Sequence, residues 1–96
     1  MTRFILSPQA ERDLDAIKAY LVEQAGAAIA RNVLLRIVQA IRFVAAHPQL
    51  GHLREDLRDP PTRFWSAYSY VIIYDPSTPI EVLRVILGAR DVTKLG

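Results

Sequence analysis

Ninety-six residues can bury only one modest hydrophobic core, so we expect a single domain over residues 1–96 and no second lobe. The absence of cysteine excludes disulfide bonds and thiolate metal sites, and a formal charge of +2 is too small to indicate a partner by itself. Charges interrupt every apolar run before the roughly 18 residues of a membrane span, and the N-terminus has too few apolar residues for a signal peptide. We therefore expect a soluble cytoplasmic protein with no membrane contact.

Two helices are predicted to follow a short N-terminal strand over residues 3–7. Ser7 followed by proline is a strong helix start, because serine caps the free N–H groups and proline fits the first turn. This helix should end near Gln24, where Gly26 can take a left-handed C-cap conformation. A second helix is predicted over residues 27–46, up to the His-Pro pair that stops it.

The second predicted helix has a wide apolar face and two apolar residues outside it. The face that should meet the sheet and the first helix comprises Ala30, Val33, Leu34, Ile37, Ile41 and Val44. Leu35 and Phe43 fall in the opposite, polar arc and should be at least partly exposed. They are either scattered surface hydrophobes or part of a partner-binding surface.

The second half of the chain has an antiparallel pattern. Residues 63–67 and 70–74 are separated by too little for a crossover and should form a hairpin, and a turn at 75–79 leads to a strand over 80–87. Residues 49–61 are predicted to form a solvated connection held to the core by Leu50, Leu53 and Leu57. The order β-α-α-β-β-β predicts an α+β fold of two layers, with the helical hairpin on one face of a mainly antiparallel sheet.

The last strand alternates between apolar residues and an arginine. Alternation places Leu83, Val85 and Leu87 toward the helices and Arg84 on the opposite face. Tyr70 and Tyr74 of the neighbouring strand can lie beside Arg84, which would give an open face rich in tyrosine and arginine. Alternatively, Arg84 is a structural residue paired with Glu11, Asp13 or Asp15 or stacked on a tyrosine.

Four segments carry a family resemblance over nearly the whole chain. They are L-S-P-Q-A-E-R-D-L at residues 6–14, H-P-Q-L-G at 47–51, Y-V-I-I-Y at 70–74 and V-L-R-V-I-L-G-A-R-D at 82–91. In this order and spacing the segments resemble the ParE branch of the ParE/RelE toxin superfamily. The resemblance implies a toxin of a type II toxin–antitoxin system with a RelE/ParE-like fold.

The resemblance leaves two activities to separate. RelE-type members cleave messenger RNA at the ribosome with basic residues and commonly a tyrosine near the C-terminus, whereas ParE-type members poison DNA gyrase. Arg90 matches the arginine of the RelE G-x-R motif, but the tyrosine should fall near Leu95 or Gly96, and neither is a tyrosine. This pattern favours a non-enzymatic gyrase inhibitor that blocks replication and arrests growth. An mRNA interferase and an inactive or regulatory antitoxin-binding module are the alternatives.

The resemblance also implies a cognate ParD-like antitoxin, with which the toxin would form a hetero-oligomer. Family antitoxins lay a helix on the helical hairpin, and the candidate residues for that contact are Leu35, Phe43, Arg31, Arg36 and Arg42.

The remaining candidate residues concern the target. Candidates for target recognition are Arg84, Arg90, Tyr70 and Tyr74, and the candidates for catalysis, if the protein is a nuclease, are Arg63, Arg84, Arg90 and Tyr70. No cofactor and no metal are expected, since two histidines cannot make a zinc site unaided.

Overall fold

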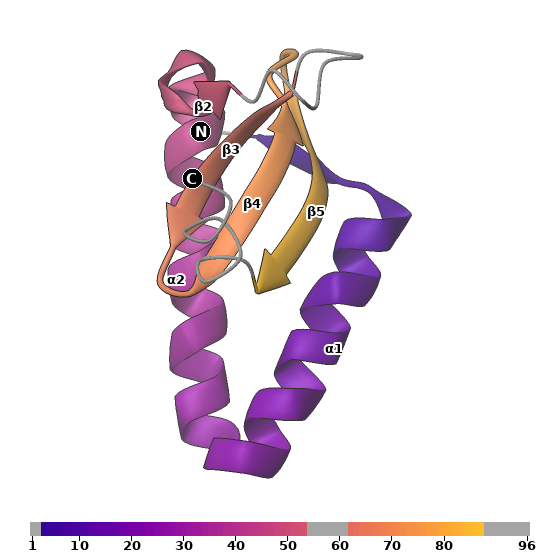
Figure 1. Cartoon of the computed structure of the whole chain (residues 1–96), viewed down its shortest axis with the longest axis vertical. Coiled ribbons are helices and arrows are strands. Elements are labelled where there is room, and N and C mark those ends of the chain that lie inside the picture. Colours follow the sequence, from indigo (N-terminus) through magenta and orange to yellow (C-terminus); the bar gives the residue numbers. More distant parts are fainter. Residues whose placement is uncertain (1–2, 54–61, 88–96) are drawn as a thin grey trace.

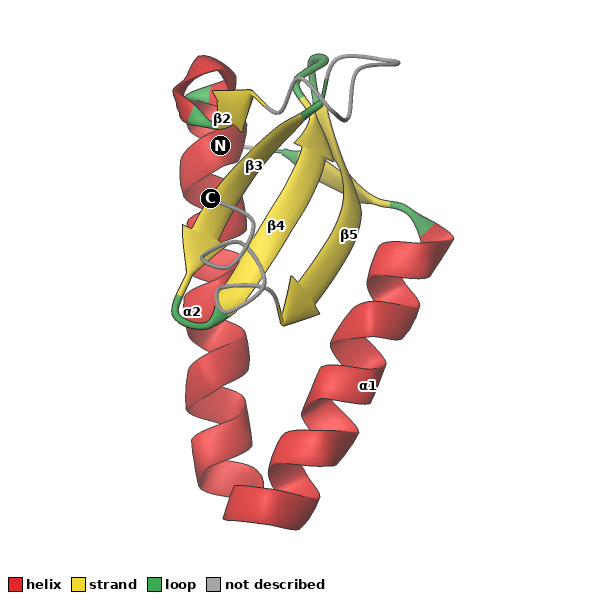
Figure 2. Ribbon diagram, viewed as in Figure 1, coloured by secondary structure: helices red, strands yellow, loops and turns green. Residues whose placement is uncertain are grey.

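Two helices cover one face of a five-stranded sheet in the computed structural model, which describes residues 3–53 and 62–87 (Figures 1 and 2). The elements in chain order are β1 (Phe4–Leu6), α1 (Pro8–Ala25), α2 (Ala27–Ala46), a 3-10 turn η1 (Pro48–Leu50), β2 (His52–Leu53), β3 (Arg63–Ala67), β4 (Tyr70–Asp75) and β5 (Ile80–Leu87). The strand order across the sheet is β1-β5-β4-β3-β2, with β1 parallel to β5 and the other neighbours antiparallel. The predicted two-layer α+β class is confirmed, with β2 as an additional short strand.

The start of α1 follows the predicted capping chemistry and also fixes the helix to the sheet. The Ser7 hydroxyl accepts a hydrogen bond from the Ala10 N–H at 3.0 Å and donates one to the Leu83 carbonyl at 2.9 Å. The Ser7 N–H donates to the Val82 carbonyl at 2.9 Å. One residue therefore caps α1 and joins the end of β1 to β5.

A single residue, Gly26, separates the two helices, which diverge from it toward the sheet (Figure 1). Its φ of 95° and ψ of 164° are accessible to glycine but energetically costly for other residues. There is room for a side chain, since a Cβ added at this position would meet no atom within 4 Å. The predicted C-cap position of Gly26 is confirmed and its φ is positive, but the predicted left-handed helical conformation is wrong, because ψ lies far from that region. The restriction at this position comes from backbone torsion and not from space.

The core lies between the helices and the sheet. Its buried residues are Ala10 from α1, Ile37, Ile41 and Val44 from α2, Tyr70, Ile72 and Tyr74 from β4, and Ile80, Val82 and Val85 from β5. Full burial of each of the large aliphatic side chains contributes about 1.5–3 kcal/mol. The predicted sheet-facing side of α2 is therefore correct, and Leu35 and Phe43 are exposed as predicted.

The predicted faces of β5 are wrong in its first half because a bulge interrupts the alternation. Arg84 pairs with Ile73 and Val82 pairs with Tyr74, which leaves Leu83 without a partner in β4. The extra residue shifts the inward-facing positions from Leu83 to Val82, which is fully buried. Beyond the bulge Val85 faces the core as predicted, whereas Leu87, at 65% exposure, lies largely in solvent.

The predicted position of Tyr70 and Tyr74 on an open face beside Arg84 is also wrong. Both rings belong to the core under the helices, with 8% and 0% of their surface exposed. Tyr74 is tolerated there because its hydroxyl has two backbone partners in the η1 turn, donating to the Pro48 carbonyl at 2.8 Å and accepting from the Gly51 N–H at 3.0 Å.

The segment after α2 is held by the hydrogen bonds of the Tyr74 hydroxyl with Pro48 and Gly51 and not by its leucines. Leu50 and Leu53 are 51% and 59% exposed, so the prediction that they fasten the segment to the core is wrong, and Leu57 lies outside the described residues.

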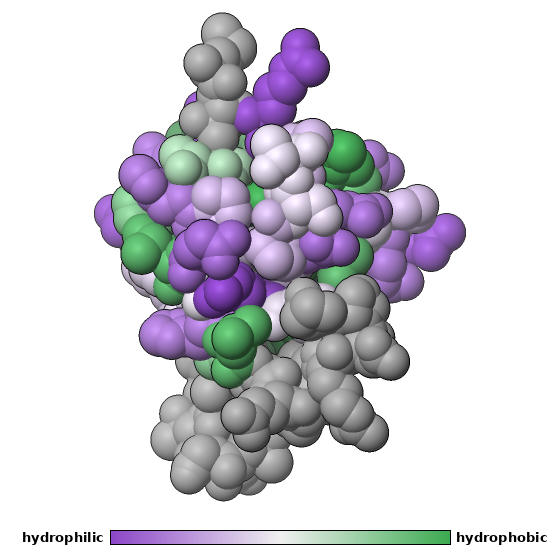
Figure 3. Space-filling model, turned by 90° about the horizontal axis from the view of Figure 1, so that it is seen from above, coloured by the Kyte–Doolittle hydropathy of each residue, from purple (hydrophilic) through white to green (hydrophobic). Residues whose placement is uncertain are grey.

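Seen from above, hydrophobic residues of the described surface stand among hydrophilic ones (Figure 3). No helix in residues 3–53 and 62–87 is long and apolar enough to cross a membrane.

Candidate functional site

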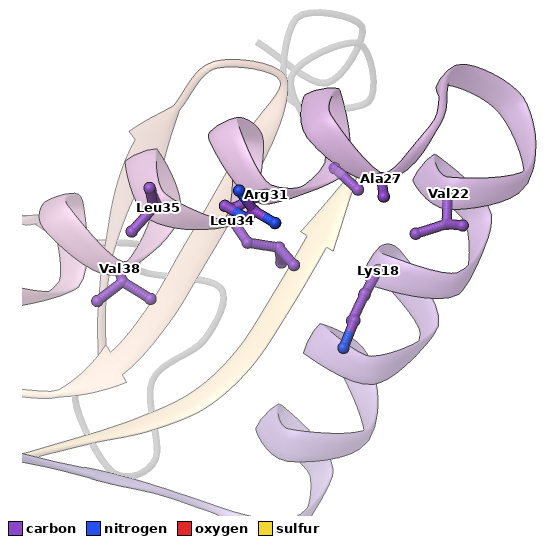
Figure 4. A pocket seen from close by; sticks show the side chains of 8 residues that line it. Lys18, Val22, Ala27, Arg31, Leu34, Leu35 and Val38 are labelled. Atoms are coloured by element: carbon purple, nitrogen blue, oxygen red, sulfur yellow. The ribbon is translucent and has the colours of Figure 1, made fainter.

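A hollow of about 360 Å³ lies between α1 and α2 near the closed end of the hairpin (Figure 4). Its lining comprises Lys18 and Val22 from α1 and Ala27, Ala30, Arg31, Leu34, Leu35 and Val38 from α2. The lining is mostly apolar, with two cationic side chains. Of the predicted antitoxin contacts, the structure places Leu35 and Arg31 in this hollow.

The hollow also contains residues that the sequence reasoning missed. Val38 follows Arg31 and Leu35 at helical spacing along one ridge of α2, and Arg42 continues that ridge at the next turn. Val22 lies four residues after Lys18 on α1. The spacing within each helix was visible in the sequence, but which ridge of α1 faces which ridge of α2 depends on the crossing of the helices.

Phe43 and Arg36 lie on a different side of α2, toward β3. The Phe43 ring is 5.4 Å from the Trp65 ring, and the Arg36 guanidinium lies 5.0 Å above the Tyr68 ring. At 100° per residue, Arg36 is about 100° round the helix from Leu35. The predicted antitoxin-binding set is thus divided between two surfaces of α2.

Arg84 has the structural role that the sequence left open as an alternative. Its Nε donates to Asp13 Oδ2 at 2.7 Å and its Nη2 to Asp13 Oδ1 at 3.2 Å, and the Val85 N–H also donates to Oδ2 at 3.0 Å. Burial by itself would raise the pKa of Asp13, but the hydrogen bonds from Arg84, Val85 and Gln9 together with the arginine charge outweigh it and lower that pKa. The same carboxylate holds the pKa of Arg84 above its ordinary value.

Arg63 is likewise engaged in holding the chain. Its Nη1 donates to the carbonyls of Gly51 at 2.7 Å and Gln49 at 3.2 Å, and its Nη2 donates to Gln49 Oε1 at 2.9 Å. Burial raises the pKa of the neighbouring Tyr74, although the Gly51 N–H and the Arg63 charge act in the opposite direction. Arg63 and Tyr74 together fix the turn after α2.

The described structure does not assemble the predicted nuclease residues around one point. Arg63 binds the η1 turn, Arg84 binds α1, and burial raises the pKa of Tyr70 within the core. Arg90 lies outside the described residues, so the structure does not place it.

The fold and the hollow define a small α+β protein with an open hollow between its two helices, and comparison with known proteins identifies its family. Residues 4–92 match the family described as the ParE toxin of type II toxin-antitoxin system, parDE. The chain therefore belongs to the ParE family of type II toxins.

Individual relatives agree with this assignment over most of their length. Toxin ParE1 of Caulobacter vibrioides is 31% identical over 86 residues, which cover 90% of this chain and 88% of that protein. Toxin ParE1 of Mycobacterium tuberculosis is 30% identical over 95 residues, covering 97% and 96%. A solved chain of the chromosomal ParDE TA system from P. aeruginosa has a TM-score of 0.73 at 22% identity, covering 88% of this chain and 94% of that chain, which shows a shared fold.

Proposed function

We propose that this toxin inhibits DNA gyrase through protein contact and that a ParD-like antitoxin neutralises it by filling the hollow between α1 and α2. The observation that carries the proposal is the match of residues 4–92 to the ParE toxin family. Gyrase is the target, and a ParD-like protein the partner, that the resemblance to this branch implies. Toxin and antitoxin would then form a hetero-oligomer.

The environment of the candidate residues supports inhibition by contact. Cleavage of RNA at a phosphodiester needs a base, a cation and a proton donor directed at one accessible point. In the described part of the chain, Arg84 is bound to Asp13, Arg63 to the carbonyl of Gly51, and the Tyr74 hydroxyl to Pro48. Each of these groups already has a partner within the fold.

The chemistry of the hollow supports an amphipathic helix with acidic residues as its occupant. The apolar lining, with Leu35 at its exposed rim, can take the apolar side of such a helix. Lys18 and Arg31 have no carboxylate within salt-bridge distance among the described residues, so both remain able to pair with an acidic antitoxin.

The activity is tested with two reactions run in parallel on the purified toxin. In one, the toxin is incubated with gyrase and supercoiled DNA, and trapped cleavage complexes are released as linear DNA by detergent and protease. In the other, it is incubated with translating ribosomes and messenger RNA, and cuts are mapped by primer extension. We expect linear DNA that disappears when the antitoxin is added. Cuts in the ribosomal A site would replace the gyrase proposal with an mRNA interferase, and no effect in either reaction would indicate an inactive or regulatory module.

The binding surface is tested with Leu35→Ser and a matched control, Ile29→Ser. Both residues lie on α2 and both are 51% exposed, but only Leu35 lines the hollow. With the protein encoded beside the toxin as antitoxin, we expect Leu35→Ser to weaken binding by about tenfold or more and Ile29→Ser to change it little. Phe43→Ser, which also removes a contact with Trp65, is a less direct test. Equal affinity of the two matched variants would contradict the assignment of the hollow.

A further inference from the structure

Charge is segregated between the two halves of the described structure. Residues 27–53 and 62–74, which include α2, β2, β3 and most of β4, contain four arginines and two histidines but no aspartate or glutamate. Helix α1, by contrast, has four carboxylates and only two cations. Within residues 27–53 and 62–74 every charged side chain of α2 and β3 is therefore basic, whereas α1 is net acidic.

Aromatic rings gather on the same basic side. The Phe43 ring lies 5.4 Å from Trp65 and 5.2 Å from His47, and the His52 ring stacks on Trp65 at 6.2 Å with an interplanar angle of 14°. Phe43 is 43% exposed, and both histidines are exposed. With Tyr68 these four rings form a surface that we name the aromatic stripe.

Tyr68 and Arg36 extend the stripe along α2. Tyr68 is 59% exposed and lies in the turn between β3 and β4, with the Arg36 guanidinium 5.0 Å above its ring. Among the described residues Arg36 has no carboxylate partner, so its charge is not neutralised within the fold. His47 lies eleven positions after Arg36, which corresponds to about 16 Å along the helix.

We infer that the aromatic stripe and Arg36 bind single-stranded nucleic acid. Exposed rings offer stacking surfaces for bases, and arginines that lack carboxylate partners offer contacts to phosphates; both features recur in proteins that bind single strands. A duplex keeps its bases stacked on each other, so the rings favour a single strand. An acidic peptide would use the Arg36 charge but has no need of the rings.

The inference is tested by fluorescence anisotropy with end-labelled oligo-dT and oligo-rU of about twelve nucleotides. Arg36 in contact with a phosphate predicts a slope of log K against log salt of about −0.7, and Arg36→Gln should bring that slope close to zero. Phe43→Leu keeps an apolar side chain against Trp65 but removes a ring, and should weaken binding by about tenfold. Stronger binding of one oligonucleotide would identify RNA or DNA as the natural ligand.

Matched variants on α1 separate this surface from a general effect of charge or aromatic content. Arg12→Gln removes the same charge as Arg36→Gln, and Tyr20→Leu removes an exposed ring of α1, which is 59% exposed. Both variants, and Leu35→Ser in the hollow, should bind the oligonucleotides like the wild type. The single tryptophan of the chain, Trp65, gives a second readout, because a stacked base should quench its emission.

Two direct results would overturn the inference: no salt-dependent binding of either oligonucleotide, or equal losses of oligonucleotide affinity in the α1 and α2 variants. A competition experiment gives a third. It would overturn the inference if a poly-glutamate peptide, at equal charge concentration, displaced the oligonucleotides and bound less tightly to Arg36→Gln but equally tightly to Phe43→Leu. The last outcome would assign the surface to an acidic protein partner. None of these measurements involves gyrase or the antitoxin, so the inference and the proposed function can fail separately.

Discussion

The Asp13 carboxylate joins α1 to β5, and replacing it with asparagine should destabilise the whole fold. Only 11% of the Asp13 side chain is exposed, and it accepts hydrogen bonds from the Arg84 guanidinium and the Val85 N–H. In Asp13→Asn, the NH₂ group of the asparagine side chain replaces one carboxylate oxygen, so it faces either the Arg84 guanidinium or the Val85 N–H, which are themselves donors, and one hydrogen bond is lost. Hydrogen bonds to a charged group contribute about 1.5–3 kcal/mol, but the Arg84 side chain is 46% exposed and water screens its share. We therefore expect a loss of about 2 kcal/mol, or roughly 10 °C in Tm.

The pH dependence of this loss identifies its origin. The pKa of Asp13 in the folded protein lies below the value of 3.8 for the free side chain. The carboxylate therefore contributes its full stabilisation above that value and loses it as the pH falls through the folded pKa. Urea unfolding near pH 7 should show the full difference between wild type and Asp13→Asn, and the difference should shrink progressively as the pH is lowered below 3.8.

Asp15→Asn is the matched control, because Asp15 lies on the same helix but is exposed. It should change the free energy of unfolding by less than about 0.5 kcal/mol. A difference between wild type and Asp13→Asn that persists unchanged at low pH would show that the charge is not the source of the stabilisation. An equal decrease in the free energy of unfolding in Asp15→Asn would show that removing any carboxylate from α1 destabilises the fold, whatever its contacts.

Other contacts make equally specific predictions for the free energy of unfolding. Tyr74→Phe should cost about 1–3 kcal/mol in urea unfolding, because it leaves the buried Gly51 N–H without its partner. Gly51→Ala should cost a similar amount because its methyl group would collide with the Tyr74 hydroxyl and with two carbons of the ring. The double variant removes the hydroxyl, which is the nearest of these atoms, and should therefore cost less than the sum of the two single variants; additive costs would show that the hydroxyl is not the main obstacle to the methyl group. Ser7→Ala should lower the free energy of unfolding by about 1–2 kcal/mol, more than the loss of an ordinary helix cap, because the hydroxyl also donates to the Leu83 carbonyl. A loss of only a few tenths of a kcal/mol would show that this second hydrogen bond contributes nothing.

The sequence predicted the elements well because their signals are local. The serine cap, the Gly26 break and the period of α2 depend on residues within a few positions of each other, and the observed boundaries follow them. The faces of β4 and β5 were less predictable. The bulge at Leu83 depends on the pairing of two strands, and no glycine or proline within β5 marks it.

The candidate site shows the same division between local and long-range information. The exposure of Leu35 and Phe43 followed from the pattern of one helix, but their separation onto two surfaces required the positions of α1 and β3. Gly26 and Gly51 show the same division, because the first is required for a local reason and the second for a long-range one. Gly26 is required for its positive φ, whereas Gly51 has an ordinary φ of −63° and is required because Tyr74 fills the space beside it. A single sequence shows a glycine in both places and cannot distinguish the reasons.

The contacts that hold α1 also bear on the proposed binding of a partner in the hollow. Helix α1 is fixed at its start, where Ser7 and Asp13 bind the backbone of β5, and at its end, where one residue joins it to α2. Lys18 and Val22 lie between these two points, so the distance across the hollow to Leu35 is set by the fold before any partner arrives. An incoming helix then meets an ordered surface, and the ordering cost that normally reduces affinity falls mainly on the partner. In the proposed binding mode, with the antitoxin helix in the hollow, Asp13 would support that binding from outside the contact surface, through the position of α1.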